Sequence, residues 1–323
     1  MGFFYSQLFK RLPYPTGSFA GKTVIITGSN CGLGKEAARH FARLGVSRLI
    51  LAVRRLDSGE DAKHDIESTT GVRKDTIQVW KLDMASYASI QEFAARVNAE
   101  LDRVDIFIAN AGVARATFHM AEDNEEGITV NVVSTVLLML LVLPKMKATA
   151  AQLSVRPTFS IVSSGVHGHT QLPQMSAPPG KLFETINDRA TAEKYWLEQY
   201  PVSKLLQMLF VRAFAQSHPP SGFPVTINLT NPGLCHSELA RDANSWRFRL
   251  FKLIVARSME VGSRTLVYAG SQGAESHGQY LADCEISNPA PFVTSRDGEE
   301  AQARVVTELT AKLEDIKTGV TRI

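Results

Sequence analysis

Short, uninterrupted apolar runs alternate along this chain with longer segments in which apolar residues recur at helical spacing. The apolar runs, which predict strands, cover residues 22–28, 48–53, 77–82, 104–109, 158–163 and 225–230. The helical segments cover residues 33–45, 58–68, 86–101 and 125–146, and a further one begins at Tyr200. Because the strand runs do not alternate apolar with polar residues, helices should cover both faces of a parallel sheet. The order predicts one doubly wound α/β domain, residues 20–323, after an N-terminal arm at residues 1–19.

The composition of the 323-residue chain is that of an ordinary globular protein, with 44% apolar and 21% charged residues. A formal net charge of +3 is too small to indicate nucleic-acid binding, and no basic run is interleaved with aromatic residues. The three cysteines, Cys31, Cys235 and Cys284, are widely spaced and form no CxxC pair. This pattern favours a reduced compartment, and we expect a cytoplasmic protein.

Two histidines close together, His167 and His169, raise the question of a metal site. No acidic residue or cysteine lies near them at ligand spacing, so we predict no metal and a structural or pocket-lining role for both. His236 is interpreted in the same way, as part of a pocket wall.

One apolar stretch, Val136–Leu143, is the strongest candidate for a membrane segment. Pro144 follows it directly and should end the helix, which leaves far fewer than the roughly 20 residues that a bilayer requires. The sequence therefore predicts a buried helix and no transmembrane segment.

The N-terminal arm is rich in aromatic residues, namely Phe3, Phe4, Tyr5 and Phe9. Gly2 and Ser6 fit the pattern for N-myristoylation, but the bulky Phe3 makes this a poor acceptor site. The arm also lacks the small-residue cleavage site of a signal peptide. Two interpretations remain, an arm that lies on the domain and an arm that makes weak contact with a membrane.

The first predicted strand leads into a helix through the glycine-rich turn "TGSNCGLG", Thr27–Gly34. Its glycines allow a tight turn and let the backbone approach a pyrophosphate, which the helix N-terminus would stabilise through its free N–H groups and its dipole. A glycine-rich turn can also serve structure alone, but a strand before it and a helix after it favour dinucleotide binding.

Tyr200 and Lys204 lie four residues apart, so a helix would place both side chains on one face. A free tyrosine has a pKa near 10, and a neighbouring ammonium group would lower that pKa by roughly one to three units. Such a tyrosine can act as a general acid or base. Pro201 disfavours helical geometry at the residue before it, which predicts that the helix starts at Tyr200. An ordinary surface helix is the alternative.

Taken in order, these motifs resemble those of the short-chain dehydrogenase/reductase superfamily. The resemblance rests on TGxxxGxG at residues 27–34, "ANAG" at 109–112, "VNVVS" at 130–134, "VSS" at 162–164, YxxxK at 200–204 and "NPG" at 231–233. It covers about residues 20–285. The strand end "LAVR" and the segment "YPVSKLLQMLF" are most similar to the retinol-dehydrogenase-like and carbonyl-reductase-like branch.

The resemblance implies a Rossmann-type fold and an active site. Tyr200 would donate and accept the proton, Lys204 would activate it, and Ser164 would polarise the substrate carbonyl. Asn131 would hold a water molecule in the proton relay. The residues implied in cofactor binding, besides Tyr200 and Lys204, are Gly28, Ser29, Asn30, Gly32, Leu33, Gly34, Arg54, Asp83, Met84, Asn110, Ala111, Gly112, Pro232, Gly233 and Ser237.

The end of the second predicted strand indicates which nicotinamide cofactor is used. Relatives that use NAD place an acidic residue there, where this chain has Val53 followed by Arg54 and Arg55. A guanidinium group can bind a 2′-phosphate in a forked geometry, whereas a carboxylate would repel it. We therefore predict NADP(H) as the cofactor, Arg54 as its phosphate ligand and Asp83 as a contact of the adenine.

Two segments should shape the substrate site. Residues 165–199 form an insert that must leave the fold beside the active site, where it could wall the pocket or cover a helix face used for dimerisation. Residues 235–255 suggest an apolar lid, although core packing is an equal alternative. The resemblance implies an oxidoreductase, monomeric or homodimeric, that interconverts a carbonyl and an alcohol on a fairly large apolar substrate such as a retinoid, steroid, lipid or natural-product intermediate. A non-redox cyclase or isomerase and a nucleotide-sensing module are the alternatives.

Overall fold

The computed structural model describes residues 2–236 and 246–323, and within these ranges it contains one large sheet of eight strands. The strands are β1 (Thr23–Thr27), β2 (Arg48–Val53), β3 (Ile77–Lys81), β4 (Ile106–Ala109), β7 (Thr158–Val162), β8 (Thr226–Asn231), β9 (Tyr280–Ala282) and β10 (Glu285–Ser287). Their order is β10-β9-β8-β7-β4-β1-β2-β3. All neighbours pair in parallel except β9 and β10. The predicted doubly wound α/β fold is confirmed, with one antiparallel edge strand in addition.

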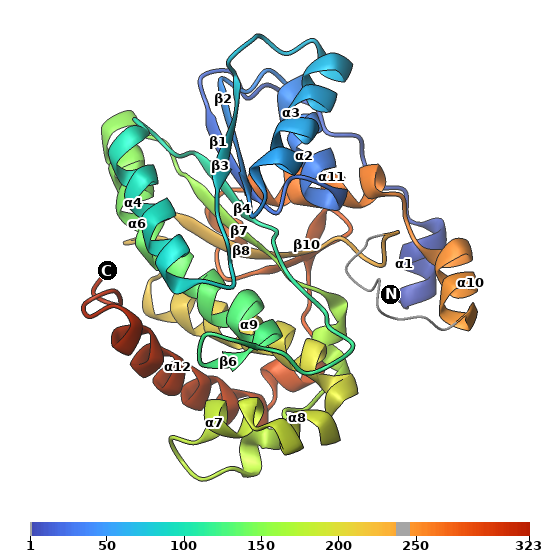
Figure 1. Ribbon diagram of the computed structural model, residues 1–323, viewed down its shortest axis with the longest axis vertical. Helices are drawn as coiled ribbons and strands as arrows, with labels where there is room; N and C mark the ends of the chain where they lie inside the picture. Colours follow the sequence, from blue (N-terminus) through green and yellow to red (C-terminus); the bar gives the residue numbers. More distant parts are fainter. Residues whose placement is uncertain (1, 237–245) are drawn as a thin grey trace.

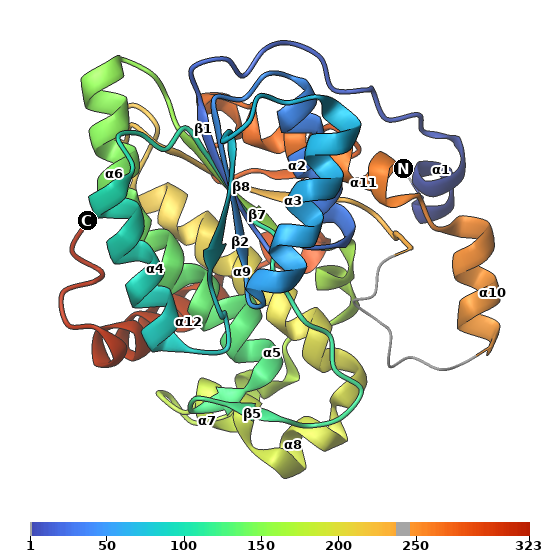
Figure 2. The ribbon, with the colours of Figure 1, turned by 45° about the horizontal axis from the view of Figure 1, so that its top comes forward.

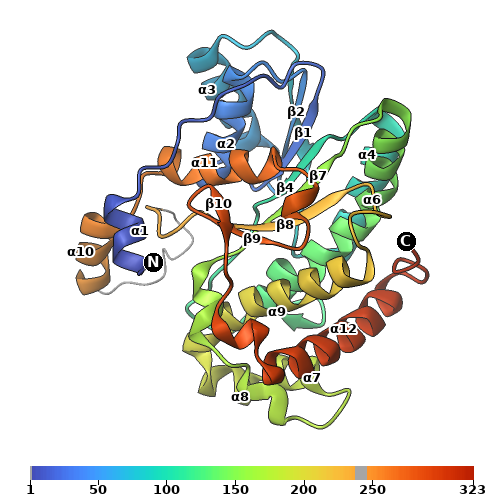
Figure 3. The same ribbon diagram turned by 180° about the vertical axis from the view of Figure 1, so that it is seen from behind.

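Helices cover both faces of the sheet, as the uninterrupted apolar strands require (Figures 1 and 3). One face carries α2 (Gly32–Arg43), α3 (Leu56–Thr70) and α11 (Met259–Gly270), and the other carries α4 (Tyr87–Glu100), α6 (Ser134–Leu153) and α9 (Trp196–Ser217). Strand β1 shows the cause. Val24 and Ile26 belong to the apolar core on the face covered by α2, α3 and α11, while Ile25 belongs to the core on the face covered by α4, α6 and α9. The alternation of side chains along a strand thus buries every residue of β1.

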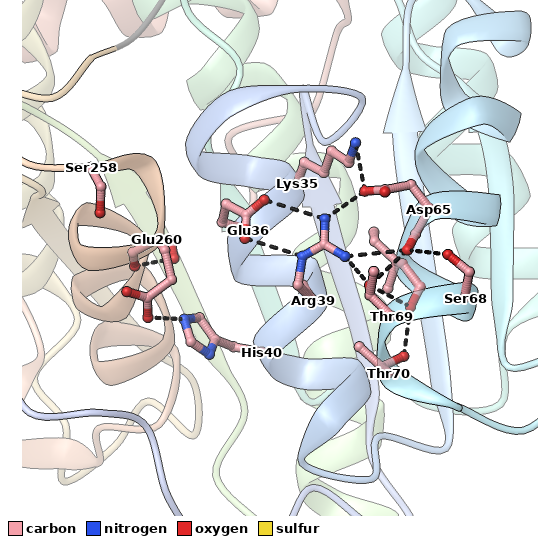
Figure 4. Close-up of polar contacts among 12 residues, drawn as sticks. Lys35, Glu36, Arg39, His40, Asp65, Ser68, Thr69, Thr70, Ser258 and Glu260 are labelled. Atoms are coloured by element: carbon pink, nitrogen blue, oxygen red, sulfur yellow. Dashed lines mark hydrogen bonds and ion pairs between the residues drawn. The ribbon is translucent and has the colours of Figure 1, made fainter.

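Polar contacts fasten the outer surface of α2 to both of its neighbours (Figure 4). Arg39 of α2 binds the carboxylates of Glu36, on its own helix, and Asp65, on α3. On the other side of α2, His40 Nε2 lies 3.1 Å from a carboxylate oxygen of Glu260 on α11. These contacts hold the helix that follows the glycine-rich turn at a fixed position.

The long apolar helix does not end at Pro144, so this part of the prediction is wrong. Helix α5 (Glu126–Ile128), a π-helical turn at Thr129–Val133 and α6 run on continuously to Leu153. This helix of 28 residues contains an 18-residue window with mean hydropathy 2.2, which is long and apolar enough to cross a membrane, but 83% of that window is buried inside the protein. Burial of side chains on both sides of Pro144, such as Leu143 and Met146, outweighs the hydrogen bond that proline removes. The predicted buried helix is thus present and longer than expected.

The insert after Ser164 folds into short helices on the side of α9 that faces away from the sheet (Figures 1 and 3). They are 3-10 helices at Gly165–His169 and Pro173–Ser176, then α7 (Leu182–Asn187) and α8 (Arg189–Lys194). The C-terminal helix α12 (Arg296–Ile316) packs against α9 and α7. Arg304 of α12 donates to the backbone carbonyls of Met175, Ala177 and Pro178, and it also pairs with Glu308. One arginine therefore fixes the proline-rich half of the insert.

Replacing Arg304 with alanine should lower the free energy of unfolding by about 2–3 kcal/mol, because three backbone carbonyls lose a charged donor. Urea denaturation measures this change. Arg296→Ala is the matched control, since Arg296 lies on the same helix, is 91% exposed and pairs only with Glu300 among the described residues. The control should change the free energy of unfolding by less than about 0.5 kcal/mol. Equal effects of the two substitutions would contradict the role of Arg304.

Candidate active site

A cleft of about 360 Å³ opens at the carboxyl ends of β1, β4 and β7. In doubly wound sheets this edge is where ligands bind. The predicted site residues that line the cleft are Gly28, Asn30, Gly32, Leu33, Arg54, Asp83, Met84, Asn110, Ala111, Gly112, Ser164, Tyr200, Lys204 and Pro232. Residues from seven separate segments of the sequence are thus brought together around one cavity.

Four predicted residues are not part of the cleft lining. The Ser29 side chain is buried and donates to the Ile26 carbonyl (2.8 Å). Gly34 lies beneath the turn, where a Cβ would come within 2.6 Å of the Gly28 oxygen. Gly233 packs against Gln7, and Asn131 lies behind the cleft wall. The predicted Ser237 falls outside the described residues.

The glycine-rich turn is fastened to the end of β4. Asn110 Nδ2 donates to the carbonyl oxygens of Thr27 (2.9 Å) and Gly28 (3.2 Å), and the Thr27 hydroxyl accepts the Ala111 N–H (2.9 Å). Gly28 has φ +63° and a Cβ there would lie 3.0 Å from the Ala111 Cα, so both conformation and space require glycine. Helix α2 begins at Gly32, which places the unpaired N–H groups of its first turn at the cleft.

Tyr200 and Ser164 form the polar centre of the cleft. The Tyr200 side chain is hydrogen-bonded to that of Ser164, and Lys204 Nζ lies 5.6 Å from the centroid of the Tyr200 ring. Lys204 is buried and donates to the carbonyl of Val162, at the end of β7 (2.9 Å). The helical spacing of Tyr200 and Lys204 therefore puts both groups at one wall, as the sequence predicts.

The helix that carries Tyr200 starts earlier than predicted. Helix α9 begins at Trp196, so Tyr200 and Pro201 lie inside it. The Tyr200 carbonyl accepts the hydroxyl of Ser203 (2.8 Å), a contact within the helix. Packing of α9 between the sheet and α12 thus overrides the preference of a residue before proline for extended geometry.

Burial shifts the pKa values of both groups in opposite directions. Desolvation raises the pKa of Tyr200 above its ordinary value, and the hydrogen bond from Ser164 opposes that rise. Burial lowers the pKa of Lys204 to about 7. The sequence predicts a lowered tyrosine pKa, and the structure contradicts this because desolvation of the phenolate outweighs an ammonium group that is directed at the Val162 carbonyl. The Tyr200 phenol is therefore protonated at neutral pH.

Asn131 supports the site from behind. It lies in the π-helical turn, and its carboxamide bonds both the N–H and the carbonyl of Val113, each at 2.9 Å. Its Nδ2 also donates to Ser203 Oγ (3.0 Å), and its backbone carbonyl accepts Gln207 Nε2. These contacts connect the cleft segment after β4 to α9, the helix that carries Tyr200. A π-turn inside a helix is often found at functional sites.

Both ring nitrogens of His167 are engaged in structural hydrogen bonds. Nε2 accepts the Ala290 N–H (2.9 Å), so Nδ1 carries the proton and donates to the Ser164 carbonyl (2.7 Å). Burial lowers the pKa of this histidine, which favours the neutral form. His167 thus holds the Ser164 segment in place, while His169 and His236 are exposed. Among the described residues no group of three metal-ligating side chains is found.

Comparisons with known proteins agree with this geometry. The family model for short chain dehydrogenase matches residues 22–155. Over 321 residues the chain is 66% identical to the short chain dehydrogenase/reductase dmxR8 of Cryptosporiopsis sp. (strain 8999), and the match covers 99% of each chain. The chain belongs to the short-chain dehydrogenase/reductase family.

Solved structures of lower identity share the fold of this family. The 3-ketoacyl-(acyl-carrier-protein) reductase of Brucella melitensis, complexed with NADH, is 20% identical with TM-score 0.61, and the match covers 82% of this chain and 97% of that chain. The RhlG/NADP active-site complex of Pseudomonas aeruginosa is also 20% identical with TM-score 0.61, covering 87% of this chain and 99% of that chain.

In this short-chain dehydrogenase/reductase the cleft also contains an ion pair that the sequence motifs do not indicate. Arg115 Nε and Nη2 bind both carboxylate oxygens of Glu126, at 2.6 and 2.7 Å. The hydrogen bond from Arg115 lowers the pKa of Glu126, and the charge of Arg54 acts in the same direction. Arg115 follows "ANAG" by three residues, but nothing in its surroundings in the sequence identifies Glu126 as its partner.

The two arginines at the end of β2 differ in their surroundings. Arg55 binds Asp57 through Nε (3.2 Å) and Nη2 (2.7 Å). The Arg54 side chain lines the cleft and, within the described part of the chain, forms no hydrogen bond or ion pair of its own. Of the two, only Arg54 is placed to meet a ligand in the cleft.

Proposed function

We propose that this short-chain dehydrogenase/reductase interconverts a carbonyl and an alcohol by hydride transfer with NADP(H). The observation that carries the proposal is the Tyr200 phenol, hydrogen-bonded to Ser164 and one helical turn from Lys204, in the same cleft as the glycine-rich turn. The substrate would be fairly large and apolar, such as a retinoid, steroid, lipid or natural-product intermediate.

The residues of the cleft fit a dinucleotide. Gly28 and Gly32, both with positive φ, let the backbone approach a pyrophosphate at the N-terminus of α2. Asp83 and Met84 would contact the adenine, and Arg54 would bind a phosphate on the adenosine ribose. When bound, the nicotinamide supplies the hydride for reduction or accepts it in oxidation. Of the two solved structures with this fold, one contains NADH and the other contains NADP. They support a nicotinamide cofactor but do not distinguish NAD from NADP.

The side chains around Tyr200 would manage the proton. In reduction, the Tyr200 hydroxyl donates its proton to the substrate oxygen, and the Ser164 hydroxyl donates a hydrogen bond to the same oxygen as negative charge develops there. Lys204, once protonated, stabilises the tyrosinate that remains. His167 keeps the Ser164 segment in position through the Ser164 carbonyl.

The walls of the cleft support an apolar substrate. The apolar residues among them include Val113, Ala114, Val130 and Val162. None of the insert residues 165–199 lines the cleft in the described part of the chain, which supports a role of the insert as a cover of α9 and α12 rather than as a pocket wall. With α9 covered in this way, we propose a monomer.

The cofactor preference tests the proposal directly. Isothermal titration of the unmodified protein should show at least tenfold tighter binding of NADPH than of NADH, about 1.4 kcal/mol. Arg54→Ala should remove most of this difference, because the 2′-phosphate loses its guanidinium partner. Arg55→Ala is the matched control and should leave the ratio unchanged, since Arg55 is bound to Asp57. Equal affinities for both cofactors in the unmodified protein would refute the NADP(H) assignment.

A further inference from the structure

The N-terminal helix α1 (Phe3–Phe9) and helix α10 (Trp246–Val255) lie side by side at one end of the molecule (Figures 1, 2 and 3). Their contact is aromatic, because the Phe251 ring stacks with Phe3 and meets Phe4 edge-on, at centroid distances of 6.4 and 6.3 Å. We call α1 and α10 the aromatic helix pair. In all three views the pair stands apart from the layers that carry the cleft.

The aromatic helix pair exposes large apolar side chains on both of its helices. They are Phe3, Phe4, Tyr5, Leu8 and Phe9 on α1, and Leu253 and Ile254 on α10. Phe9 is 70% exposed and Leu253 is 73% exposed. Soluble monomeric proteins rarely expose a group of large apolar side chains to this extent. Apolar residues of this size gathered on adjacent elements indicate an interaction surface.

The aromatic helix pair is held firmly to the domain, so its exposed residues do not belong to a loose tail. The Gln7 side chain accepts the Leu234 N–H (3.1 Å) and donates to the carbonyls of Leu234 (2.9 Å) and Val255 (3.2 Å). Arg257, which is buried, binds the Ser6 carbonyl and Asp283, both at 2.7 Å. These contacts fix α1 against the segment that follows Pro232, a residue of the cleft wall.

The two sequence segments that carry the aromatic helix pair are basic. The first acidic residue of the chain is Glu36, and none occurs between residues 246 and 259. The basic residues of these segments that adjoin the pair in sequence are Lys10, Arg11, Arg247, Arg249, Lys252 and Arg257. Two acidic residues from other segments lie beside the pair, but Asp283 is bound by Arg257 and Glu285 is bound by Lys10. Arg11 is exposed. A partner of this surface should therefore have an apolar interior and negatively charged groups at its surface.

We propose that the aromatic helix pair docks on the surface of a membrane that contains anionic lipids. Helices of 7 and 10 residues are far too short to span a bilayer, so they would lie at the interface with their apolar side chains in the acyl boundary. The exposed Arg11 beside them would meet the lipid headgroups. A second copy of the chain is a poorer partner, because a symmetric contact would place positive charge against positive charge.

Vesicle binding tests the proposal without any dependence on the redox activity. The full-length protein should sediment with vesicles of phosphatidylcholine that contain phosphatidylserine, and bind vesicles of phosphatidylcholine alone more weakly. Phe4→Ser combined with Phe9→Ser should weaken binding by at least about tenfold, because two large apolar groups no longer enter the interface. Arg11→Gln should weaken binding to the anionic vesicles by about fivefold.

Met120→Ser combined with Leu197→Ser is the matched control, since these residues are also exposed, by 54% and 93%, but lie on other elements. The control should bind like the unmodified protein, and circular dichroism should show that all variants are folded. The proposal is overturned if the unmodified protein does not bind anionic vesicles, or if the control loses as much binding as the Phe4 and Phe9 variant. It is also overturned if light scattering shows a dimer that the Phe4 and Phe9 substitutions convert to a monomer.

Discussion

Replacing Tyr200 with phenylalanine should lower the turnover of carbonyl reduction by about 10²–10⁴-fold, the usual contribution of a positioned general acid. The substitution removes one hydroxyl from a residue that shares the cleft with Ser164 and Lys204. Phenylalanine fits the same space, so the fold and the cofactor affinity should change little. Turnover is measured through the loss of absorbance of the reduced nicotinamide with a panel of apolar ketones and aldehydes.

Tyr195→Phe provides the matched control for this result. Tyr195 lies at the N-terminus of the same helix α9 and does not line the cleft, so loss of its hydroxyl should leave turnover unchanged. Near-native turnover of Tyr200→Phe would contradict the redox assignment. A product formed by the unmodified protein without any change in the nicotinamide would favour the alternative of a cyclase or isomerase.

The strands of the central sheet could be predicted because burial on both faces leaves a direct trace in the sequence. All six predicted strand runs are present, and β2 spans Arg48–Val53 as expected. The edge strands β9 and β10 could not be predicted, since each has three residues and they contain polar groups. They are joined by a turn at Asp283 and Cys284, which both have positive φ. Such turns usually contain glycine or asparagine, and the absence of these residues hides the turn in the sequence.

The candidate site could be predicted where the spacing along one element sets the geometry, as for Tyr200 and Lys204. It could not be predicted where distant segments meet. The pairing of Arg115 with Glu126 across the cleft, and of Gln7 with Leu234, depends on how loops pack rather than on periodicity. Hydrogen bonds from side chains to backbone carbonyls are especially hard to predict from sequence, because every residue has a backbone carbonyl that could be the acceptor.

The direction of the Tyr200 pKa shift shows the same limit. The sequence contains the lysine that would lower this pKa but does not contain the degree of burial, and burial decides the sign. Pro144 in α6 is a similar case. The free energy lost with one backbone hydrogen bond is smaller than the free energy gained by burying the helical turns on both sides of the proline. Tertiary packing thus overrides local preference at both positions.

Replacing Lys204 with methionine should abolish most of the activity and yet stabilise the protein at neutral pH. Burial lowers the pKa of Lys204 from 10.5 to about 7, so between these values the unfolded chain binds a proton that the folded chain does not. The buried ammonium therefore destabilises the fold fully below pH 7, and this penalty is lost as pH rises from 7 to 10.5. Methionine of similar length removes the charge, and the free energy of unfolding near pH 7 should rise by on the order of 3 kcal/mol.

The same pKa sets the pH dependence of catalysis. In the proposed mechanism protonated Lys204 stabilises the tyrosinate left after Tyr200 donates its proton, so kcat/KM for reduction should fall as pH rises above about 7. In Lys204→Met, turnover should drop by at least about 100-fold and this inflection should disappear. Urea denaturation at pH 6.5 and pH 9 should show a gain in stability that shrinks at the higher pH. Lys74→Met, at an exposed position outside the cleft, should show neither effect. A gain that is equal at both pH values would mean that the stabilisation comes from packing alone and that Lys204 does not titrate near neutral pH.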